Sequence, residues 1–364
     1  MNFSAEGPAM YAAEGNGSAA ELSASCSQVR VEYLDGWRGL AIITVLIGHF
    51  GSAYWPPLYV LGGLGVDLFF VLSGRLMADI LFVSAQPLPT FFFRRFARIF
   101  PALLVFASSM GATALFAYAL RGKVLMAPWE YVSALTFTIN YAQAVGGLSS
   151  TLLAHIWSLS VEEHCYIMFA VIALSLGRSI RRAKWVLAAF ALAGVLNGIR
   201  LYAAGAGGVH EIFWRTDVRL APAFFSAAMF LWRRDATSLS DKTKRVFRWM
   251  PQLCVALTGL LFFLAPFVVM YTASALLLAA AVNTLDLVPA RLRRALSAPI
   301  LTIFGRLSYS IYLWQQPLFR LNGRVPGVVL VGAVIVVGLL SYYVVERPAR
   351  TRLNNLMLGP QSEL

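Results

Sequence analysis

The chain alternates long apolar runs with short polar segments, a pattern typical of a protein that crosses a membrane several times. An apolar helix of about 20 residues spans the hydrocarbon core of a bilayer. Such helices are predicted over 37–54, 58–82, 100–120, 153–176, 185–203, 216–232, 250–264, 267–287, 299–319 and 327–345. The segment 131–147 is more polar and is predicted to be an incomplete or re-entrant helix. The sequence therefore predicts an all-α polytopic membrane protein with about ten transmembrane helices.

The two ends of the chain are polar. Residues 1–30 are rich in Ala, Ser, Gly and Glu and contain no apolar run, so they are predicted to be a disordered cytosolic tail and not a signal peptide. Residues 31–350 are predicted to form one membrane domain of ten helices. Residues 351–364 are predicted to be a second, short cytosolic tail.

The composition supports the membrane assignment. Hydrophobic residues make up 59% of the chain and charged residues only 13%, whereas soluble domains are about half apolar and about a quarter charged. The formal net charge is +13, which in a soluble protein would suggest a nucleic-acid partner. Here the basic residues form short runs between apolar segments, as in 178–184 and 290–295. If both termini are cytosolic, most Lys and Arg lie on the cytosolic side, which is the usual bias, and we expect no nucleic-acid partner.

The first predicted helix carries an arginine near its start and a histidine inside it. Arg38 and His49 are eleven residues apart, which is roughly 16 Å of helix and about half of a bilayer core. A histidine near the middle of a membrane is costly unless it has a partner, so His49 is a candidate functional residue. The alternative is a structural histidine that hydrogen-bonds a neighbouring helix.

Two carboxylates also stand within apolar runs. Asp67 lies in GGLGVDLFFVLSG, residues 62–74, where a buried carboxylate needs a cation or several donors. Its structural interpretation is a partner for an arginine, with Arg38 as the candidate. Glu162 lies in HIWSLSVEEHCY, residues 155–166, which contains too many polar side chains to face lipid. We expect Glu162 to face the interior of the helix bundle.

Three arginines crowd into FFFRRFARIFP, residues 91–101. Arg94 and Arg98 are four residues apart and share a helix face, so their two guanidinium groups could form a fork that binds phosphates. Arg95 lies between them. The alternative is ordinary anchoring of the helix by positive charge at the cytosolic face.

Together these groups indicate a reaction site. Basic side chains at a cytosolic mouth suit a ligand that carries several phosphates, and a histidine suits general base catalysis, with a nearby carboxylate to orient its ring. The chain has no GxSxG, Walker or HExxH motif, and its three cysteines share no close spacing. Hydrolase, ATPase and metalloenzyme functions therefore lack support, and we expect no metal.

The order of these motifs resembles that of the acyltransferase-3 family, integral membrane acyltransferases that commonly modify surface glycans and sometimes small metabolites. The resemblance covers nearly all of residues 31–350. It rests on Arg38-x10-His49, the motif at 62–74, the arginine cluster ending at Pro101, WSLSVEEHCY at 157–166, SYSIYLW at 308–314 and ERP at 346–348.

The resemblance implies ten spans in the inner membrane of a bacterium and acyl transfer from cytosolic acyl-CoA, with acetyl-CoA expected, to a hydroxyl group. The site residues that it implies are Arg38 and His49 as essential groups, Glu162 as a functional carboxylate, and two arginines at the donor. The R-x-x-R spacing of the family selects Arg95 and Arg98, with Arg94 close by. Asp67 stays a candidate for the catalytic group.

Two features depart from the family pattern. Many relatives have a histidine after the YLW of the penultimate span, where this chain has Gln315, so a catalytic role at that position is not expected. Many relatives also carry an extracytoplasmic hydrolase-like domain at the C-terminal end. We expect this chain to be a membrane unit that either delivers the acyl group directly or passes it to a separate periplasmic acyl-accepting protein.

The leading functional hypothesis is an acyl-CoA-dependent O-acyltransferase that acts on a sugar hydroxyl of a surface polysaccharide, a glycolipid or a lipid-linked sugar, with membrane lipid as a further expected partner. His49 would remove the hydroxyl proton or carry the acyl group transiently, and Arg38 would lie near the phosphates or the thioester oxygen of the donor. A different hypothesis is a proton-coupled transporter or flippase, since charged groups inside a membrane equally mark transport pathways. A non-catalytic scaffold would have no reason to retain so many costly buried charges.

Overall fold

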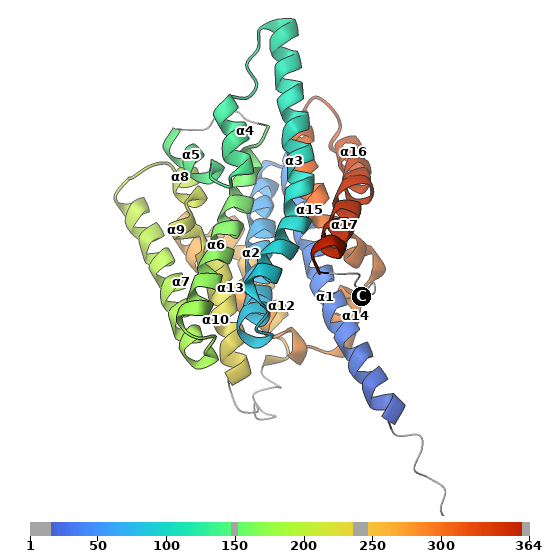
Figure 1. The fold of residues 1–364 in the computed structure, drawn as a ribbon. Helices are drawn as coiled ribbons and strands as arrows, with labels where there is room; N and C mark the ends of the chain where they lie inside the picture. The colour runs from blue at the N-terminus through green and yellow to red at the C-terminus, as the bar shows by residue number, and fades with distance from the viewer. Residues whose placement is uncertain (1–15, 147–151, 236–246, 359–364) are drawn as a thin grey trace, which may run out of the picture.

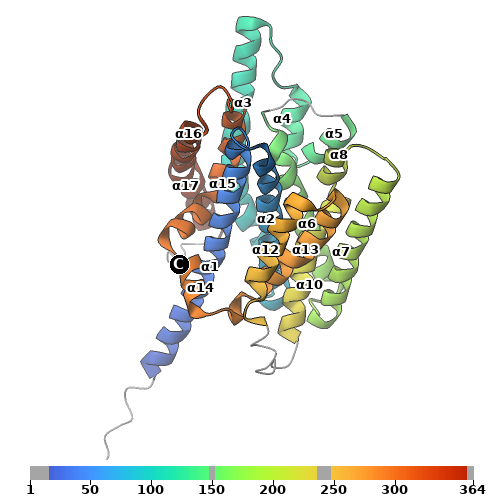
Figure 2. The same ribbon diagram turned by 180° about the vertical axis from the view of Figure 1, so that it is seen from behind.

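The protein is a bundle of long helices that run side by side (Figures 1 and 2). The computed structural model describes residues 16–146, 152–235 and 247–358. Within these ranges the regular structure is helical, apart from an isolated bridge between Asn322 and Val325. The all-α prediction is therefore confirmed for the described part of the chain.

The helices follow one another with short connections. Their bounds are α1 (Asn16–Gly51), α2 (Val60–Ala78), α3 (Leu88–Arg121), α4 (Pro128–Leu135), α5 (Ile139–Gly146), α6 (Trp157–Ser175), α7 (Ile180–Ala203), α8 (Val209–Trp214), α9 (Thr216–Arg219), α10 (Ala221–Asp235), α12 (Met250–Leu264), α13 (Phe267–Asn283), α14 (Ala290–Leu296), α15 (Pro299–Phe319), α16 (Gly327–Leu340) and α17 (Arg347–Leu358). Proline in the first turn opens several of them, including α3, α4 and α15, because that position needs no backbone N–H. The αL residue Gly122 ends α3.

Several helices have the length and composition to cross a membrane. Among the described residues these are Leu88–Arg121, Ala154–Ser175, Ile180–Ala203 and Gly327–Met357, and two shorter apolar helices cover Met250–Leu264 and Phe267–Asn283. This finding fits a multi-pass membrane protein. The count of ten spans and the cytosolic placement of both termini stay predictions.

As the sequence predicts, the segment 131–147 forms no full-length helix. Two helices of eight residues each, α4 and α5, cover most of it. Each is about 12 Å long at 1.5 Å per residue, which is less than half of a bilayer core. Residues 147–151 lie outside the described part of the chain.

The N-terminal region differs from its prediction. Helix α1 begins at Asn16, so residues 16–30 are helical although the sequence suggested a tail without fixed structure. The segment contains Ala, Leu and Glu, which favour helix. It extends an existing helix, so it does not require a new and costly helix nucleus. Residues 1–15 are not among those described.

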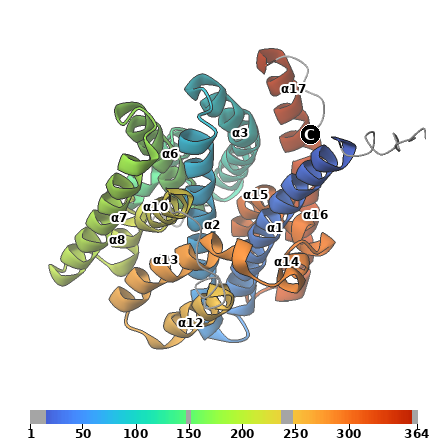
Figure 3. The ribbon, with the colours of Figure 1, turned by 90° about the horizontal axis from the view of Figure 1, so that it is seen from below.

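Helix α2 lies at the centre of the bundle, with α1 and α15 on one side and α6 and α10 on the other (Figure 3). Glycines bring α1 unusually close to two of its neighbours. A Cβ atom added to Gly39 would lie 2.0 Å from the carbonyl oxygen of Leu301 in α15, and one added to Gly48 would lie 2.3 Å from the backbone nitrogen of Gly62 in α2. Small residues allow such close helix packing. The contacts fix Arg38 and His49, which α1 carries, relative to both neighbouring helices.

Candidate active site

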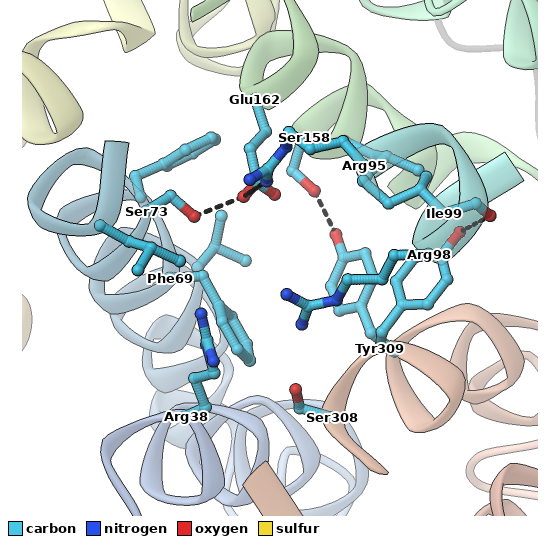
Figure 4. Close-up of a pocket in the computed structure, with 15 residues that line it drawn as sticks. Arg38, Phe69, Ser73, Arg95, Arg98, Ile99, Ser158, Glu162, Ser308 and Tyr309 are labelled. Atoms are coloured by element: carbon cyan, nitrogen blue, oxygen red, sulfur yellow. Dashed lines mark hydrogen bonds and ion pairs between the residues drawn. The ribbon is translucent and has the colours of Figure 1, made fainter. Parts of the chain in front are cut away.

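A cavity opens among α1, α2, α3, α6 and α15 (Figure 4). It is partly open to the surroundings, and the space of about 760 Å³ within its walls and mouth includes open solvent. Four charged side chains from three helices line it, namely Arg38, Arg95, Arg98 and Glu162. Apolar side chains cover much of the remaining wall, namely Val66, Phe69, Phe70, Leu76, Ile99 and Leu159. The cavity thus combines a cationic region with an apolar wall.

Helix α3 presents two arginines to the cavity. Arg95 and Arg98 are three residues apart, so they lie on the same side of the helix. Arg98 points into the cavity (Figure 4), and within the described part of the chain no hydrogen bond or ion pair engages its guanidinium group. Arg94 is exposed and does not line the cavity. The R-x-x-R spacing therefore selects the cavity-lining pair, whereas the Arg94–Arg98 fork is not formed there.

Arg95 is held by groups on α6. Its guanidinium carbon lies 3.3 Å from the centroid of the Tyr166 ring, and its Nη2 lies 3.8 Å from Oε1 of Glu162. The Arg95 side chain is only 12% exposed. Stacking on an aromatic face and pairing with a carboxylate both stabilise a buried guanidinium group. These contacts fix the direction of Arg95 toward the cavity.

Glu162 faces the bundle interior, as the sequence predicts. Its Oε1 accepts a hydrogen bond from the Ser73 hydroxyl (Figure 4) and another from the Tyr166 hydroxyl. Two hydroxyl donors and one nearby guanidinium group compensate the cost of removing this carboxylate from water. The arrangement makes Glu162 an anchor for the cavity wall formed by α2, α3 and α6.

Arg38 enters the cavity from α1. Its Nη1 donates a hydrogen bond to Oδ1 of Asp35 at 3.0 Å, and the two side chains are 20% and 21% exposed. Figure 4 shows Arg38 and Arg98 directed into the cavity from different walls. The cavity therefore gathers three guanidinium groups in its walls.

Asp67 does not line the cavity, and its partner is not Arg38. Oδ1 of Asp67 lies 2.5 Å from Nη2 of Arg219, and the two side chains are 1% and 0% exposed. The Arg219 guanidinium group also lies 3.6 Å from the centroid of the Phe213 ring. The expected pairing with Arg38 is wrong, because Arg219 lies nearer and is buried with Asp67. The structural interpretation of Asp67 as the partner of an arginine holds.

His49 forms a second polar centre farther along α1. Its Nδ1 lies 2.6 Å from Oε1 of Gln315, and its ring stacks on Phe319 with centroids 4.7 Å apart. His49 is not among the cavity-lining residues, but Tyr312, one turn before Gln315 in α15, is. Tyr312 and Gln315 are three residues apart, so they lie on one face of α15.

Several cavity groups were not singled out from the sequence. Tyr312 and Ser158 line the cavity and lie 2.6 Å apart between their hydroxyl oxygens, and the Tyr309 hydroxyl donates to the carbonyl of Ile99 at 2.8 Å. Both tyrosines fall within SYSIYLW at 308–314. That motif carried the family resemblance without assigning a role to any hydroxyl.

Arg219 was visible at the start of the span at 216–232, but nothing in the sequence links it to Asp67.

Comparison with known proteins identifies the family of this chain. The acyltransferase domain of the acyltransferase 3 family matches residues 31–345, and the chain belongs to that family. The chain is 28% identical over 360 residues to the peptidoglycan O-acetyltransferase OatA of Listeria monocytogenes, with 89% of this chain and 56% of the relative covered. It is 26% identical over 352 residues to the O-acetyltransferase OatA of Staphylococcus aureus, with 88% of this chain and 57% of the relative covered.

This chain spans a little over half the length of these relatives. No solved structure matches it. The comparisons therefore establish the family and the acyltransferase domain.

The buried pair gives a test of the structural interpretation of Asp67. Replacing Asp67 by Ala leaves Arg219 buried without its carboxylate, and we expect a loss of about 3–5 kcal/mol of stability. The double variant Asp67→Leu/Arg219→Met removes both charges and should recover most of that loss. Unfolding of the purified protein in detergent measures both effects. A stable Asp67→Ala protein that has lost activity would instead assign Asp67 a direct role in the reaction.

Proposed function

We propose that the protein is a membrane O-acyltransferase that moves an acyl group, acetyl in the first instance, from cytosolic acyl-CoA to a hydroxyl of a sugar in a surface polysaccharide or glycolipid. The observation that carries the proposal is the convergence of Arg38, Arg95 and Arg98 on one cavity in a chain of the acyltransferase 3 family. The proposed location is the inner membrane of a bacterium, with the cavity mouth toward the cytosol.

The cationic region suits the phosphates of coenzyme A. Guanidinium groups bind phosphate oxygens through two parallel hydrogen bonds and remain charged at all physiological pH values. Arg98 has no competing ion pair within the described residues, so it is available to a phosphate. The apolar wall, including Phe69 and Leu159, suits the arm that carries the thioester. In the proposal, CoA binds with its phosphates at the arginines and its thioester directed toward Tyr312.

His49 is placed to act at the thioester end. It lies roughly 16 Å from Arg38 along α1, and CoA likewise carries its thioester at the far end of a long arm from its phosphates. In the proposed reaction, His49 accepts the proton of the acceptor hydroxyl while the hydroxyl oxygen attacks the thioester carbonyl. The new C–O bond forms, the C–S bond breaks, and the proton passes from His49 to the CoA thiolate. Arg38 is proposed to stabilise the bound donor.

The names of the relatives favour a sugar acceptor. One of them is a peptidoglycan O-acetyltransferase, and a hydroxyl of a cell-surface glycan is the proposed acceptor here. Delivery to a separate extracytoplasmic acyl-accepting protein is the alternative route. The transporter hypothesis required Asp67 to take part in a proton relay. Asp67 is instead paired with Arg219, which weakens that hypothesis.

The donor site is tested by CoA binding. Replacing Arg98 by Gln removes charge-assisted hydrogen bonds worth about 1.5–3 kcal/mol, so we expect CoA affinity to fall about 10- to 100-fold. The matched variant is Arg94→Gln, on the same helix but outside the cavity, which should change the affinity little. Isothermal titration of the purified protein with CoA measures both. Equal losses in the two variants would show that general positive charge on α3, and not the cavity, attracts CoA.

The catalytic assignment is tested by turnover. We expect purified wild-type protein in nanodiscs to release free CoA from acetyl-CoA in the presence of oligosaccharide acceptors, and His49→Ala to lose this activity by about 100-fold or more, since general base catalysis contributes on that order. CoA binding by His49→Ala should be unchanged, because His49 does not line the arginine cavity. Full activity of a well-folded His49→Ala protein would remove His49 from the mechanism.

A further inference from the structure

Helix α15 holds the His49 ring by two contacts. Oε1 of Gln315 lies 2.6 Å from Nδ1, and the Phe319 ring stacks on the imidazole with centroids 4.7 Å apart and planes 27° apart. Gln315 and Phe319 are four residues apart, so they lie on one helix face. The Gln315 side chain is fully buried, so water does not compete for the contact. The imidazole plane is therefore set by α15.

The backbone of His49 is fixed as well. Its carbonyl oxygen accepts a hydrogen bond from the Ser52 hydroxyl at 2.6 Å and another from Nδ2 of Asn322 at 2.9 Å. Asn322 lies just beyond the end of α15 at Phe319. The same end of α15 thus holds both the ring and the main chain of His49. This arrangement leaves the imidazole little freedom to turn.

The other ring nitrogen, Nε2, lies beside a glycine. Among the described residues, none forms a hydrogen bond with Nε2 of His49. Gly62 of α2 lies beside it, and a Cβ atom at that position would lie only 3.2 Å from Nε2. A residue larger than glycine would therefore crowd this nitrogen. Nε2 is the ring atom that the protein leaves open for a ligand.

We propose that Gln315 is a positioning residue for His49: its Oε1 accepts a hydrogen bond from Nδ1–H, which keeps the proton on Nδ1 and leaves the lone pair on Nε2, beside Gly62. The proposal rests on the proposed function, in which His49 takes a proton from the acceptor hydroxyl. A neutral imidazole carries one N–H and one lone pair, so a hydrogen bond that fixes the proton on Nδ1 also decides which nitrogen is the base.

The chemistry of an amide partner differs from that of a carboxylate. A carboxylate beside imidazole stabilises the protonated ring, whereas the uncharged amide oxygen of Gln315 orients the ring with less stabilisation of its positive charge. His49 paired with an amide returns its proton more readily. In the proposed reaction this favours transfer of the proton from Nε2 to the departing CoA thiolate.

The tautomer of His49 tests the geometry directly. The chain contains four histidines, so ¹⁵N-labelling of histidine gives few imidazole signals, and His49→Ala assigns the one that disappears. We expect the wild-type signal to be that of the Nδ1–H tautomer. We expect Gln315→Leu to lose this preference. Gln316→Leu, the same change at the next position, should retain it. Gln315→Asn, which is too short to reach Nδ1, provides a second variant if Gln315→Leu does not fold.

The effect of the His49 tautomer on turnover is tested by measuring CoA release from acetyl-CoA in the presence of oligosaccharide acceptors. We expect the turnover rate to fall about 10- to 100-fold in Gln315→Leu, part of the general base contribution, with CoA affinity unchanged and Gln316→Leu at the wild-type rate. An Nε2–H tautomer in the wild type would overturn the proposal, as would a lost tautomer preference at an unchanged rate. If His49→Ala retains full activity, the proposed catalytic role of His49 fails, and if the wild type releases no CoA, the proposed function fails; in both cases the NMR signal still decides whether Gln315 sets the tautomer.

Discussion

The cost of burying charge in an apolar helix bundle shapes the whole site. A guanidinium or carboxylate group inside such a bundle must have partners or face a polar ligand. Asp67 and Arg219 form a buried ion pair, and Glu162 is held by two hydroxyl groups and Arg95. Arg98 stands apart, because it points into the cavity without an ion pair within the described residues. Arg98 is therefore the group to which the proposed function assigns a phosphate of the donor.

The glycine contacts of α1 fix the positions of Arg38 and His49 relative to the neighbouring helices. Gly39 lets α1 approach α15, and Gly48 lets it approach α2 beside Gly62. Arg38 and His49 are thereby held on one rigid helix between the same two neighbours. A ligand that carries phosphates at one end and a reactive group at the other can use both positions. In the proposed function, binding and chemistry are separated along the helix axis, and Tyr312 of α15 lines the cavity at the binding end.

Much of the site could be predicted because its information is local. The spacing of Arg95 and Arg98 determines their common helix face, and the interval between Arg38 and His49 determines their separation along α1. The polar content of 155–166 likewise indicated that Glu162 faces inward. The short helices α4 and α5 followed from a run too polar and too interrupted to form a span.

The remaining features depend on contacts between residues far apart in the chain. Nothing in the apolar pattern shows that Asp67 meets Arg219 and not Arg38, because both arginines lie near predicted helix starts. The contact between His49 and Gln315 joins residues 266 positions apart, and its discovery required the packing of α1 on α15. The helical start of α1 at Asn16 was missed because composition alone described 16–30 as a tail.

A structure of the protein bound to a non-hydrolysable thioether analogue of acetyl-CoA tests the central claim most directly. The account predicts phosphate groups between Arg38, Arg95 and Arg98, with the sulfur of the analogue directed past Tyr312 toward Nε2 of His49. Phosphates bound outside the arginine cavity, or a sulfur directed away from His49, would contradict it.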